Sequence, residues 1–320
     1  MSKLILHVGM PKTGSSYIQS IVNMNYTLFE SKSSVGFLRN IKPHALAAHF
    51  IDCETLSERQ DIFELKEIEF NDIDLELEEL SSSRETVFIS SEYFILSNGG
   101  KLIEFLRKYF NEIQIVLTAR RQDKLLASGY NQDVKALGRT SSLAWSYESS
   151  PTFDYYNCCL VWENLGCKVY VIDYDKVKKK SDGLLTSFLE VANLSKFIDV
   201  TELSQPNNKV SNESLTYDEV ILKLALNRLN ISDEKILNNF KLYTKPNKIF
   251  EIPALYKNIM LNTYHKGNKA IVDKYLNSDP SSELLFQGET IQATQEKQFN
   301  WDPINQNEHL LAFLIKSVTE

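Results

Sequence analysis

A short loop near the start of the chain, bounded by two glycines, has the residue types that bind phosphate. The segment reads Gly9-Met10-Pro11-Lys12-Thr13-Gly14-Ser15-Ser16. Its glycines are five positions apart, as in the Gly-x4-Gly-Lys-Ser/Thr loop, whose backbone N–H groups and following helix hold phosphate oxygens. Ser15 replaces the usual lysine, and the cation lies inside the loop at Lys12. This favours a shorter anionic group over the β- and γ-phosphates of ATP, although a strand–turn–helix junction can carry the same residues for geometry alone.

An arginine and a serine farther along the chain could bind a second phosphate. Arg120 follows the apolar run 113–119, and Ser128 comes eight residues later in a predicted helix. If both face the crevice edge that holds the loop, a guanidinium fork and a hydroxyl would converge on a separate phosphate, and Arg121 would add positive charge. A strand-end arginine is equally well a surface salt-bridge residue. The pair indicates a phosphate site only in combination with the loop.

The elements that must position these residues alternate along the chain. Apolar runs predict buried strands, and segments with helical periodicity lie between them. The predicted strands are 4–8, 86–90, 113–119 and 168–173, and the predicted helices begin at 15 or span 101–109, 122–137 and 153–165. This order predicts an α/β fold, a P-loop-type parallel sheet flanked by helices.

The last third of the chain reads as helical. No further strand is predicted after residue 201, and helical patterns span 217–229, 233–243 and 254–276. We therefore expect an α/β core over residues 1–200 and a helical extension over residues 201–320 that packs on it. The acidic segment 52–80 fits a strand or a helix, and we interpret it as a helix with a solvated charged face.

Composition excludes several classes of protein. The chain has 320 residues, a net charge of −7 and only 11 Gly and 8 Pro, which excludes collagen-like and disordered chains. Residues 52–92 hold fourteen acidic and three basic side chains, so the rest of the chain has a small positive net charge. The overall charge makes a broad nucleic-acid-binding surface unexpected, but a single anionic ligand could bind in the positive part. No apolar run approaches the roughly 18 residues of a membrane span. Four cysteines without zinc-site spacing favour buried thiols in the cytoplasm: Cys53, Cys158, Cys159 and Cys167.

These motifs together resemble the sulfotransferases that use 3′-phosphoadenosine-5′-phosphosulfate (PAPS). The segment 7–16 is similar to their 5′-phosphosulfate loop, and Arg120 with Ser128 and Tyr130 is similar to their 3′-phosphate motif. The wider pattern looks most like bacterial, glycan-directed members. It covers residues 3–195 and includes Ser90-Ser91-Glu92, Arg120-Arg121-Gln122-Asp123, Tyr130-Asn131-Gln132, Asp154-Tyr155 and Trp162.

The resemblance implies a role for each motif residue. Lys12 would meet the leaving oxygen of the phosphosulfate, while Arg120 and Ser128 would bind the 3′-phosphate. The 5′-phosphate would be held by the end of the loop and the start of the helix, at Thr13, Gly14, Ser15 and Ser16. The co-substrate would be PAPS, with no metal required, and the acceptor would be a hydroxyl, most plausibly on a saccharide.

Two residues are candidates for the general base that accepts the hydroxyl proton. Glu92 leads because it follows the strand 86–90 and should emerge at the same sheet edge, although it could instead cap a turn or pair with an arginine. His44 is second, because imidazole suits the role, yet a histidine on a helix face is often a packing residue. Asn131, Asp154 and Tyr155 either contact the acceptor or cap and pack helices.

Two other functions compete with sulfuryl transfer. An ATP-dependent kinase on a degenerate phosphate loop would need Mg²⁺, and Ser15 in the place of the usual lysine speaks against it. A non-catalytic nucleotide-binding module would bind the donor analogue without transferring a group.

Overall fold

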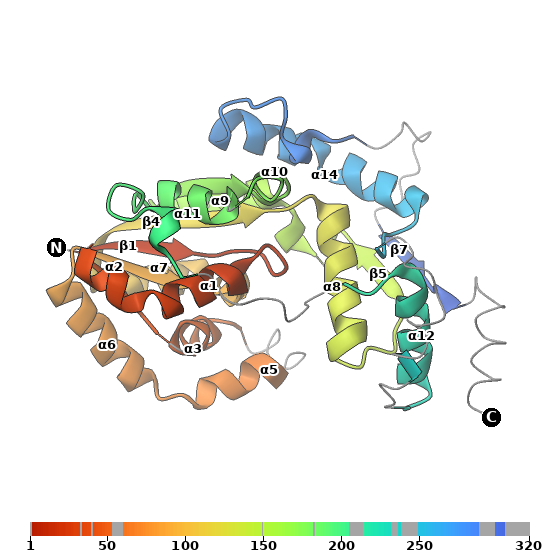
Figure 1. Ribbon diagram of the computed structural model, residues 1–320, viewed down its shortest axis with the longest axis horizontal. Helices are drawn as coiled ribbons and strands as arrows, with labels where there is room; N and C mark the ends of the chain where they lie inside the picture. Colours follow the sequence, from red (N-terminus) through yellow and green to blue (C-terminus); the bar gives the residue numbers. More distant parts are fainter. Residues whose placement is uncertain are drawn as a thin grey trace. The chain divides into compact units, whose positions relative to one another are not determined.

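A five-stranded parallel sheet forms the centre of the first part of the chain (Figure 1), in the strand order β2-β3-β1-β4-β6. The computed structural model describes residues 2–32, 34–39, 41–52, 60–148, 150–181, 183–204, 214–231, 236–237, 249–287 and 298–304. The strands are β1 (Ser2–His7), β2 (Val35–Phe37), β3 (Thr86–Ser90), β4 (Phe110–Ala119) and β6 (Lys168–Asp173). The predicted α/β fold and its four strands are confirmed, and β2 is an additional strand of three residues.

Helices connect the strands and cover the sheet. They include α1 (Ser15–Met24), α2 (Tyr26–Lys32), α3 (Lys42–His49), α5 (Gln60–Phe63), α6 (Phe70–Ser83), α7 (Gly99–Leu106), α9 (Tyr155–Asn164), α10 (Tyr174–Val177) and α11 (Gly183–Val191). Ile5 and Val116 pack in one buried cluster with residues of α1 and α11. Leu4 and Leu6, which alternate with Ile5 and so point to the opposite face, are fully buried as well. Both faces of the sheet are therefore covered.

The acidic segment forms a helix, as predicted. Helix α6 buries Ile73, Leu77 and Leu80, which recur at helical spacing, and its acidic positions lie between them. The apolar stripe therefore anchors the helix while most carboxylates remain in water.

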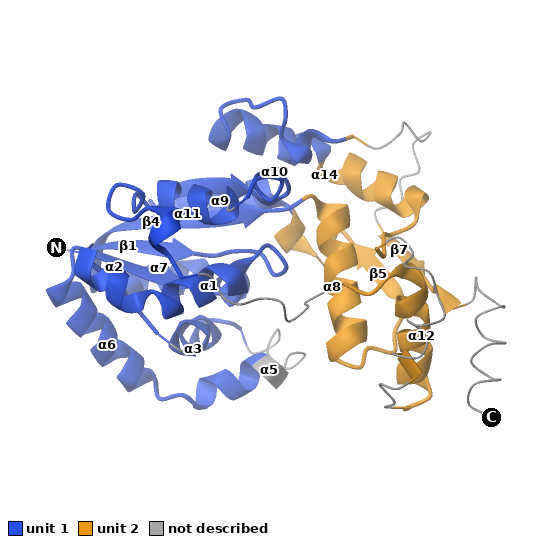
Figure 2. Cartoon of the chain, viewed as in Figure 1, with its two compact units in different colours: residues 1–120, 154–208, 265–286 blue, residues 121–153, 209–264, 287–320 orange. Residues whose placement is uncertain are grey.

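The chain divides into two compact units (Figure 2). Unit 1 comprises residues 1–120, 154–208 and 265–286, and unit 2 comprises 121–153, 209–264 and 287–320. The two units interleave along the chain, whereas the sequence-based division into 1–200 and 201–320 cuts it once.

Unit 2 contains helices and a small antiparallel sheet. Its helices are α8 (Gln122–Ala136), α12 (Tyr217–Arg228) and the first half of α14 (Ala254–Tyr275), which confirms two predicted helices; the third, 233–243, lies almost entirely outside the described residues. The prediction of no strand after residue 201 was wrong, because β7 (Gln298–Trp301) pairs with β5 (Leu143–Ser146). The partners are some 150 residues apart, and no local pattern reveals such a pairing.

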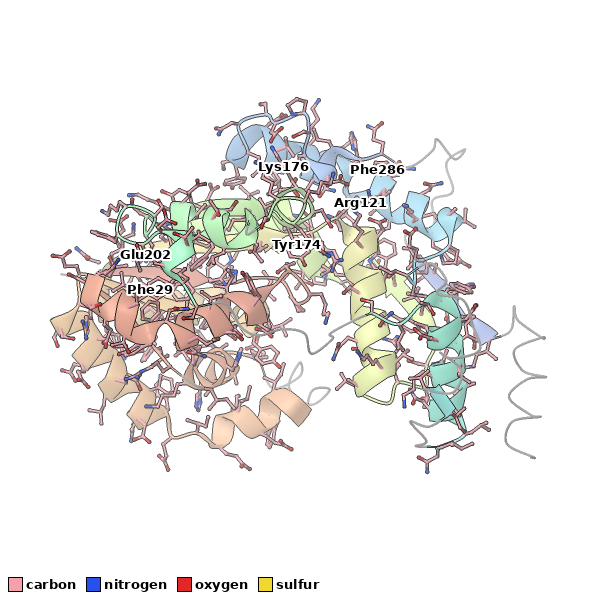
Figure 3. All side chains as sticks on the ribbon, in the orientation of Figure 1. Phe29, Arg121, Tyr174, Lys176, Glu202 and Phe286 are labelled. Atoms are coloured by element: carbon pink, nitrogen blue, oxygen red, sulfur yellow. The ribbon has the colours of Figure 1, made fainter. Side chains whose placement is uncertain are left out.

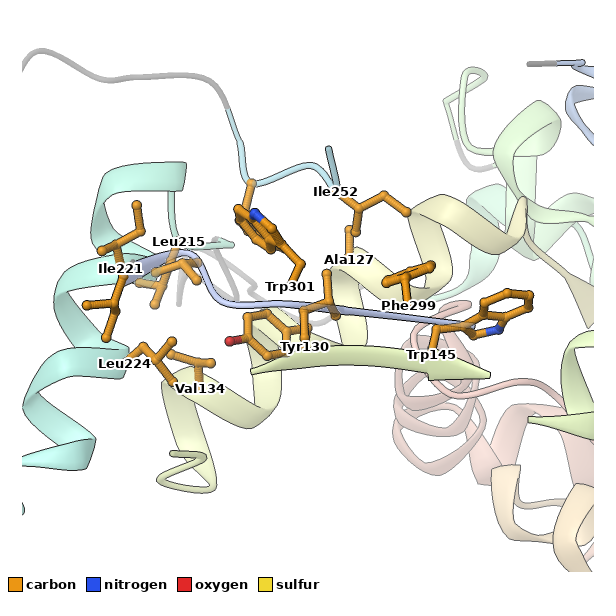
Figure 4. Close-up of a cluster of buried hydrophobic side chains, with 14 of the residues drawn as sticks. Ala127, Tyr130, Val134, Trp145, Leu215, Ile221, Leu224, Ile252, Phe299 and Trp301 are labelled. Carbon is orange, nitrogen blue, oxygen red and sulfur yellow. The ribbon is translucent and has the colours of Figure 1, made fainter. Parts of the chain in front are cut away.

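An aromatic cluster fills the interior of unit 2 (Figure 4). The ring centres of Trp145 and Phe299 are 5.6 Å apart, as are those of Tyr130 and Phe250. Trp301 is 3% exposed. These large side chains stabilise the unit by apolar burial and ring packing.

The described cysteines form no disulfide, and one of them has a strongly raised pKa. Cys158, Cys159 and Cys167 are free, and burial raises the pKa of Cys158 to about 12, so that thiol stays protonated at neutral pH. Cys53 lies outside the described residues. Within the described part of the chain, no helix has both the length and the apolar composition needed to cross a bilayer.

Candidate functional site

The glycine-bounded loop joins β1 to α1 and is held from within. The Thr13 hydroxyl donates to the Met10 carbonyl oxygen at 2.5 Å. Lys12 and Gly14 both adopt positive φ, 62° and 84°. The positive φ of Gly14 favours glycine, and a Cβ there would also lie 2.4 Å from Leu184 Cδ2, so that side chain would have to move. The loop geometry is thus built into its sequence.

Helix α1 begins without a side-chain cap. Its N-cap is Gly14, and its first turn contains no acidic residue. The Ser15 side chain is buried and donates to Met10 O at 3.4 Å, whereas Ser16 lines a cavity. The uncapped N–H groups and the positive end of the helix dipole are the features that bind an anion.

Arg120 lies against this loop. Strands β1 and β4 are parallel neighbours, so the end of β4 meets the same sheet edge. Arg120 Nη1 donates to the Lys12 carbonyl oxygen at 2.8 Å, and its backbone oxygen accepts the Tyr155 hydroxyl at 2.6 Å. The guanidinium stacks 5.2 Å from the ring centre of Tyr174 (labelled in Figure 3), with Nε 3.8 Å from Asp175. Arg120 therefore lies beside the loop, with the Asp175 carboxylate offsetting part of its charge.

The other half of the predicted 3′-phosphate motif belongs to unit 2. Ser128 lies on α8, and Tyr130, two residues on, is buried in the aromatic cluster, where its hydroxyl donates to Ser141 O at 3.2 Å. Arg121 donates from Nε and Nη2 to the Asp123 carboxylate, at 2.6 and 2.9 Å. Its charge is thus neutralised by a neighbour on α8, contrary to the expectation that it adds positive charge for the ligand.

Three possible acceptor contacts have structural roles. Asn131 donates to Leu215 O at 2.8 Å and accepts from Leu215 N at 3.0 Å. Asp154 caps α9 through the backbone N–H of Asn157, and Tyr155 supports the backbone of Arg120. The capping and packing interpretation is favoured for all three.

A cavity of about 360 Å³ opens beside α1 in unit 1. It is lined by Ser16, Gln19, Ser20, Val22, Asn23, Phe37, Leu38, Ile41, Pro43, His44, Phe88 and Ser90. Ser16 is also the last of the four residues expected to hold the 5′-phosphate. The cavity therefore adjoins the position that the loop would give to a bound anion.

Both candidate bases belong to this region. His44, on α3, lines the cavity, and its Nδ1 lies 2.7 Å from Ser91 Oγ. Glu92 directly follows Ser91 and accepts from Gln19 Nε2 at 3.3 Å; it is not among the described lining residues. Burial lowers the pKa of His44, and the nearby Glu92 carboxylate opposes this shift only in part. At neutral pH the imidazole is uncharged and able to accept a proton.

Sequence reasoning missed Gln19 and Asn23. With Ser16 and Ser20 they recur at the spacing i, i+3, i+4, i+7, which places four polar side chains on one face of α1. The apolar residues Ile18 and Ile21 occupy the other face, and Val22 borders the polar stripe. This polar stripe directly after a phosphate loop was the available signal.

A second cavity, of about 620 Å³, lies along β5 and β7 in unit 2. Tyr256 is the sole titratable side chain among its described lining residues. Its described lining holds no histidine and no carboxylate, so the loop and the cavity beside α1 remain the candidate site.

A buried histidine lies beneath the loop. His7 Nδ1 is 2.9 Å from Ser90 Oγ, and Nε2 is 3.2 Å from Thr118 Oγ1. Burial lowers the pKa of His7 from 6.5 to about 4. Because this histidine is uncharged when folded, it ties three strands together without the cost of a buried charge.

The His7 pKa predicts how stability depends on pH. The unfolded chain binds the proton more tightly, so the free energy of unfolding should be highest above pH 6.5 and fall by about 3 kcal/mol as pH decreases from 6.5 to 4. Urea unfolding at a series of pH values measures this. His7→Asn should flatten that part of the profile, and an unchanged profile in the variant would contradict the assignment.

Comparisons with known proteins assign neither a family nor a function to this chain. No protein-family model matches it, and no curated protein matches it. A solved structure from work on the PezAT chromosomal toxin–antitoxin system of Streptococcus pneumoniae aligns at 15% identity, over 72% of this chain and 86% of that chain, with a TM-score of 0.33. At that identity and TM-score the similarity carries no functional argument.

Proposed function

We propose that this protein is a sulfotransferase that moves a sulfuryl group from PAPS to an acceptor hydroxyl, on a saccharide. One observation carries the proposal: an uncapped loop–helix junction, with Lys12 inside the loop, adjoins a cavity lined by an uncharged histidine. The loop suits a phosphosulfate, and the histidine suits a hydroxyl acceptor. A cytoplasmic location belongs to the proposal, because the described cysteines are free thiols.

The donor would be bound at both of its phosphate groups. The backbone N–H groups at the start of α1 would hold the 5′-phosphate, at Thr13, Gly14, Ser15 and Ser16. Arg120 would bind the 3′-phosphate. It already lies at the loop, through its bond to the Lys12 carbonyl.

The transfer step needs alignment and charge stabilisation rather than a covalent intermediate. The acceptor oxygen attacks sulfur and forms the new O–S bond. The bond from sulfur to the bridging oxygen breaks, and its electron pair leaves with the 5′-phosphate, where the Lys12 ammonium stabilises the charge.

The acceptor proton passes to His44 Nε2. This requires the tautomer in which Nδ1–H donates to Ser91 Oγ, and the 2.7 Å contact suits that arrangement. Glu92 is the alternative base, because it is near enough to influence the pKa of His44.

The donor assignment is tested with 3′-phosphoadenosine-5′-phosphate and AMP, which differ by the 3′-phosphate. We expect the wild type to bind the bisphosphate at least about tenfold more tightly, since a hydrogen bond to a charged group contributes roughly 1.5–3 kcal/mol. Arg120→Ala should abolish this preference. Arg107→Ala, at the end of α7 and before β4, should retain it.

Comparing two ligands on the same variant separates recognition of the 3′-phosphate from general damage to the fold. Equal binding of both nucleotides to the wild type would contradict the donor assignment. Mg²⁺-dependent ATP turnover would instead support a kinase.

A further inference from the structure

We propose that the cavity beside α1 binds the acceptor, and that the acceptor is a small, uncharged hydroxyl compound with one apolar face, of the size of a single neutral sugar ring. This inference rests on the proposed function for its chemistry. It adds the class of acceptor, which the loop motif leaves open.

Part of the cavity lining is polar but uncharged. Ser16, Gln19, Ser20 and Asn23 project from one face of α1, and Ser90, at the end of β3, lies within hydrogen-bond distance of Gln19. Gln19 is held by bonds to Ser90 Oγ at 3.2 Å and to Glu92. Among the described residues, no side-chain hydrogen bond engages Ser20 or Asn23, so a hydroxyl and an amide remain for the hydroxyls of a ligand.

Most of the remaining lining is apolar. It comprises Val22, Phe37, Leu38, Ile41, Pro43 and Phe88. Ile41, at the start of α3, leaves 50% of its surface exposed, although most large aliphatic side chains of this unit are buried. A bound ring would cover this apolar edge and gain the corresponding burial energy.

The charge at the cavity disfavours an anionic acceptor. Its described lining contains no Lys, Arg, Asp or Glu side chain. The nearest cations along the chain are already engaged: Arg39 stacks 3.8 Å from the ring centre of Tyr26, and Lys42 pairs with Glu76. Glu92, which influences His44, would repel a carboxylate or sulfate. The described lining itself offers an anion no cationic partner to offset its desolvation cost.

The size of the cavity limits the acceptor as well. Small-molecule sites span roughly 300–1,000 Å³, and this cavity, at about 360 Å³, is near the lower end. It therefore suits one ring rather than an extended chain of sugars.

Two probes test the inference: methyl β-D-glucopyranoside and methyl β-D-glucuronide, which carry a hydroxymethyl group and a carboxylate, respectively, on the same sugar ring. Binding is measured by calorimetry, with and without 3′-phosphoadenosine-5′-phosphate. We expect the glucoside to bind at least about tenfold more tightly than the glucuronide. Absent glucoside binding, or equal binding of both probes, would overturn the inference.

A charge introduced at the apolar edge locates the site. Ile41→Lys should reduce or reverse the preference for the neutral probe, because it supplies the missing cation. Leu75→Lys, on α6 and 64% exposed, adds the same charge away from the cavity lining and should leave the preference unchanged. Equal behaviour of the two variants would contradict this location.

The failure of this inference is distinguishable from that of the proposed function. Glucoside binding without nucleotide binding would contradict the sulfotransferase proposal but support the ligand class of the cavity. Nucleotide binding without glucoside binding would overturn the acceptor class alone.

Discussion

Replacing Lys12 with methionine should lower kcat for sulfuryl transfer by about 10²–10³-fold, the loss typical of removing one group that stabilises a developing negative charge. Lys12 lies within the loop at a positive φ of 62°, between the end of β1 and the uncapped start of α1. Methionine keeps the length of the side chain and removes its charge. The loss should therefore appear in the chemical step more than in donor binding.

Single-turnover transfer of labelled sulfate from PAPS measures the effect. Lys101→Met is the matched control, because Lys101 is an exposed lysine in the first turn of α7 and should be replaceable without loss. Comparable rates for Lys12→Met and the wild type would mean that the loop cation does not act on the leaving group. A change confined to donor affinity would limit Lys12 to binding.

The sequence predicted those parts of the fold and site that depend on local patterns. The loop, its strand and its helix are contiguous, and the positive φ of Gly14 favours glycine at that position. The position of Arg120 follows from strand order, because neighbouring parallel strands end at one sheet edge. The apolar run 113–119 therefore predicts that Arg120, the residue directly after it, lies at this sheet edge.

The parts that were missed depend on pairings between distant segments. Strand β2 has three residues, and β7 pairs with β5 across about half of the chain. The position of His44 beside the cavity depends on how α3 packs near β3, through its contact with Ser91. Periodicity cannot supply such a contact. For this reason Glu92 was favoured over His44 from sequence, whereas the cavity lining favours His44.

If His44 is the general base, His44→Gln should reduce kcat by about 10²–10⁴-fold, the usual contribution of a positioned acid or base. Glutamine can still bond to Ser91 but cannot take up the acceptor proton. The matched control is His49→Gln on the same helix, where Nε2 lies 3.1 Å from the Ile68 carbonyl oxygen; it should change kcat by less than about twofold. Glu92→Gln distinguishes the two candidate bases and should cost less than His44→Gln.

The pH profile of kcat/KM gives a second measurement of the same assignment. The base must be uncharged to act, and burial places the pKa of His44 below its usual 6.5. The wild-type rate should therefore be constant above pH 6.5 and fall only at lower pH, where the imidazole gains a proton. That acid limb should disappear from the residual activity of His44→Gln. An acid limb that persists in His44→Gln but vanishes in Glu92→Gln would assign the base to the carboxylate, because only the titrating base can remove the limb when it is replaced.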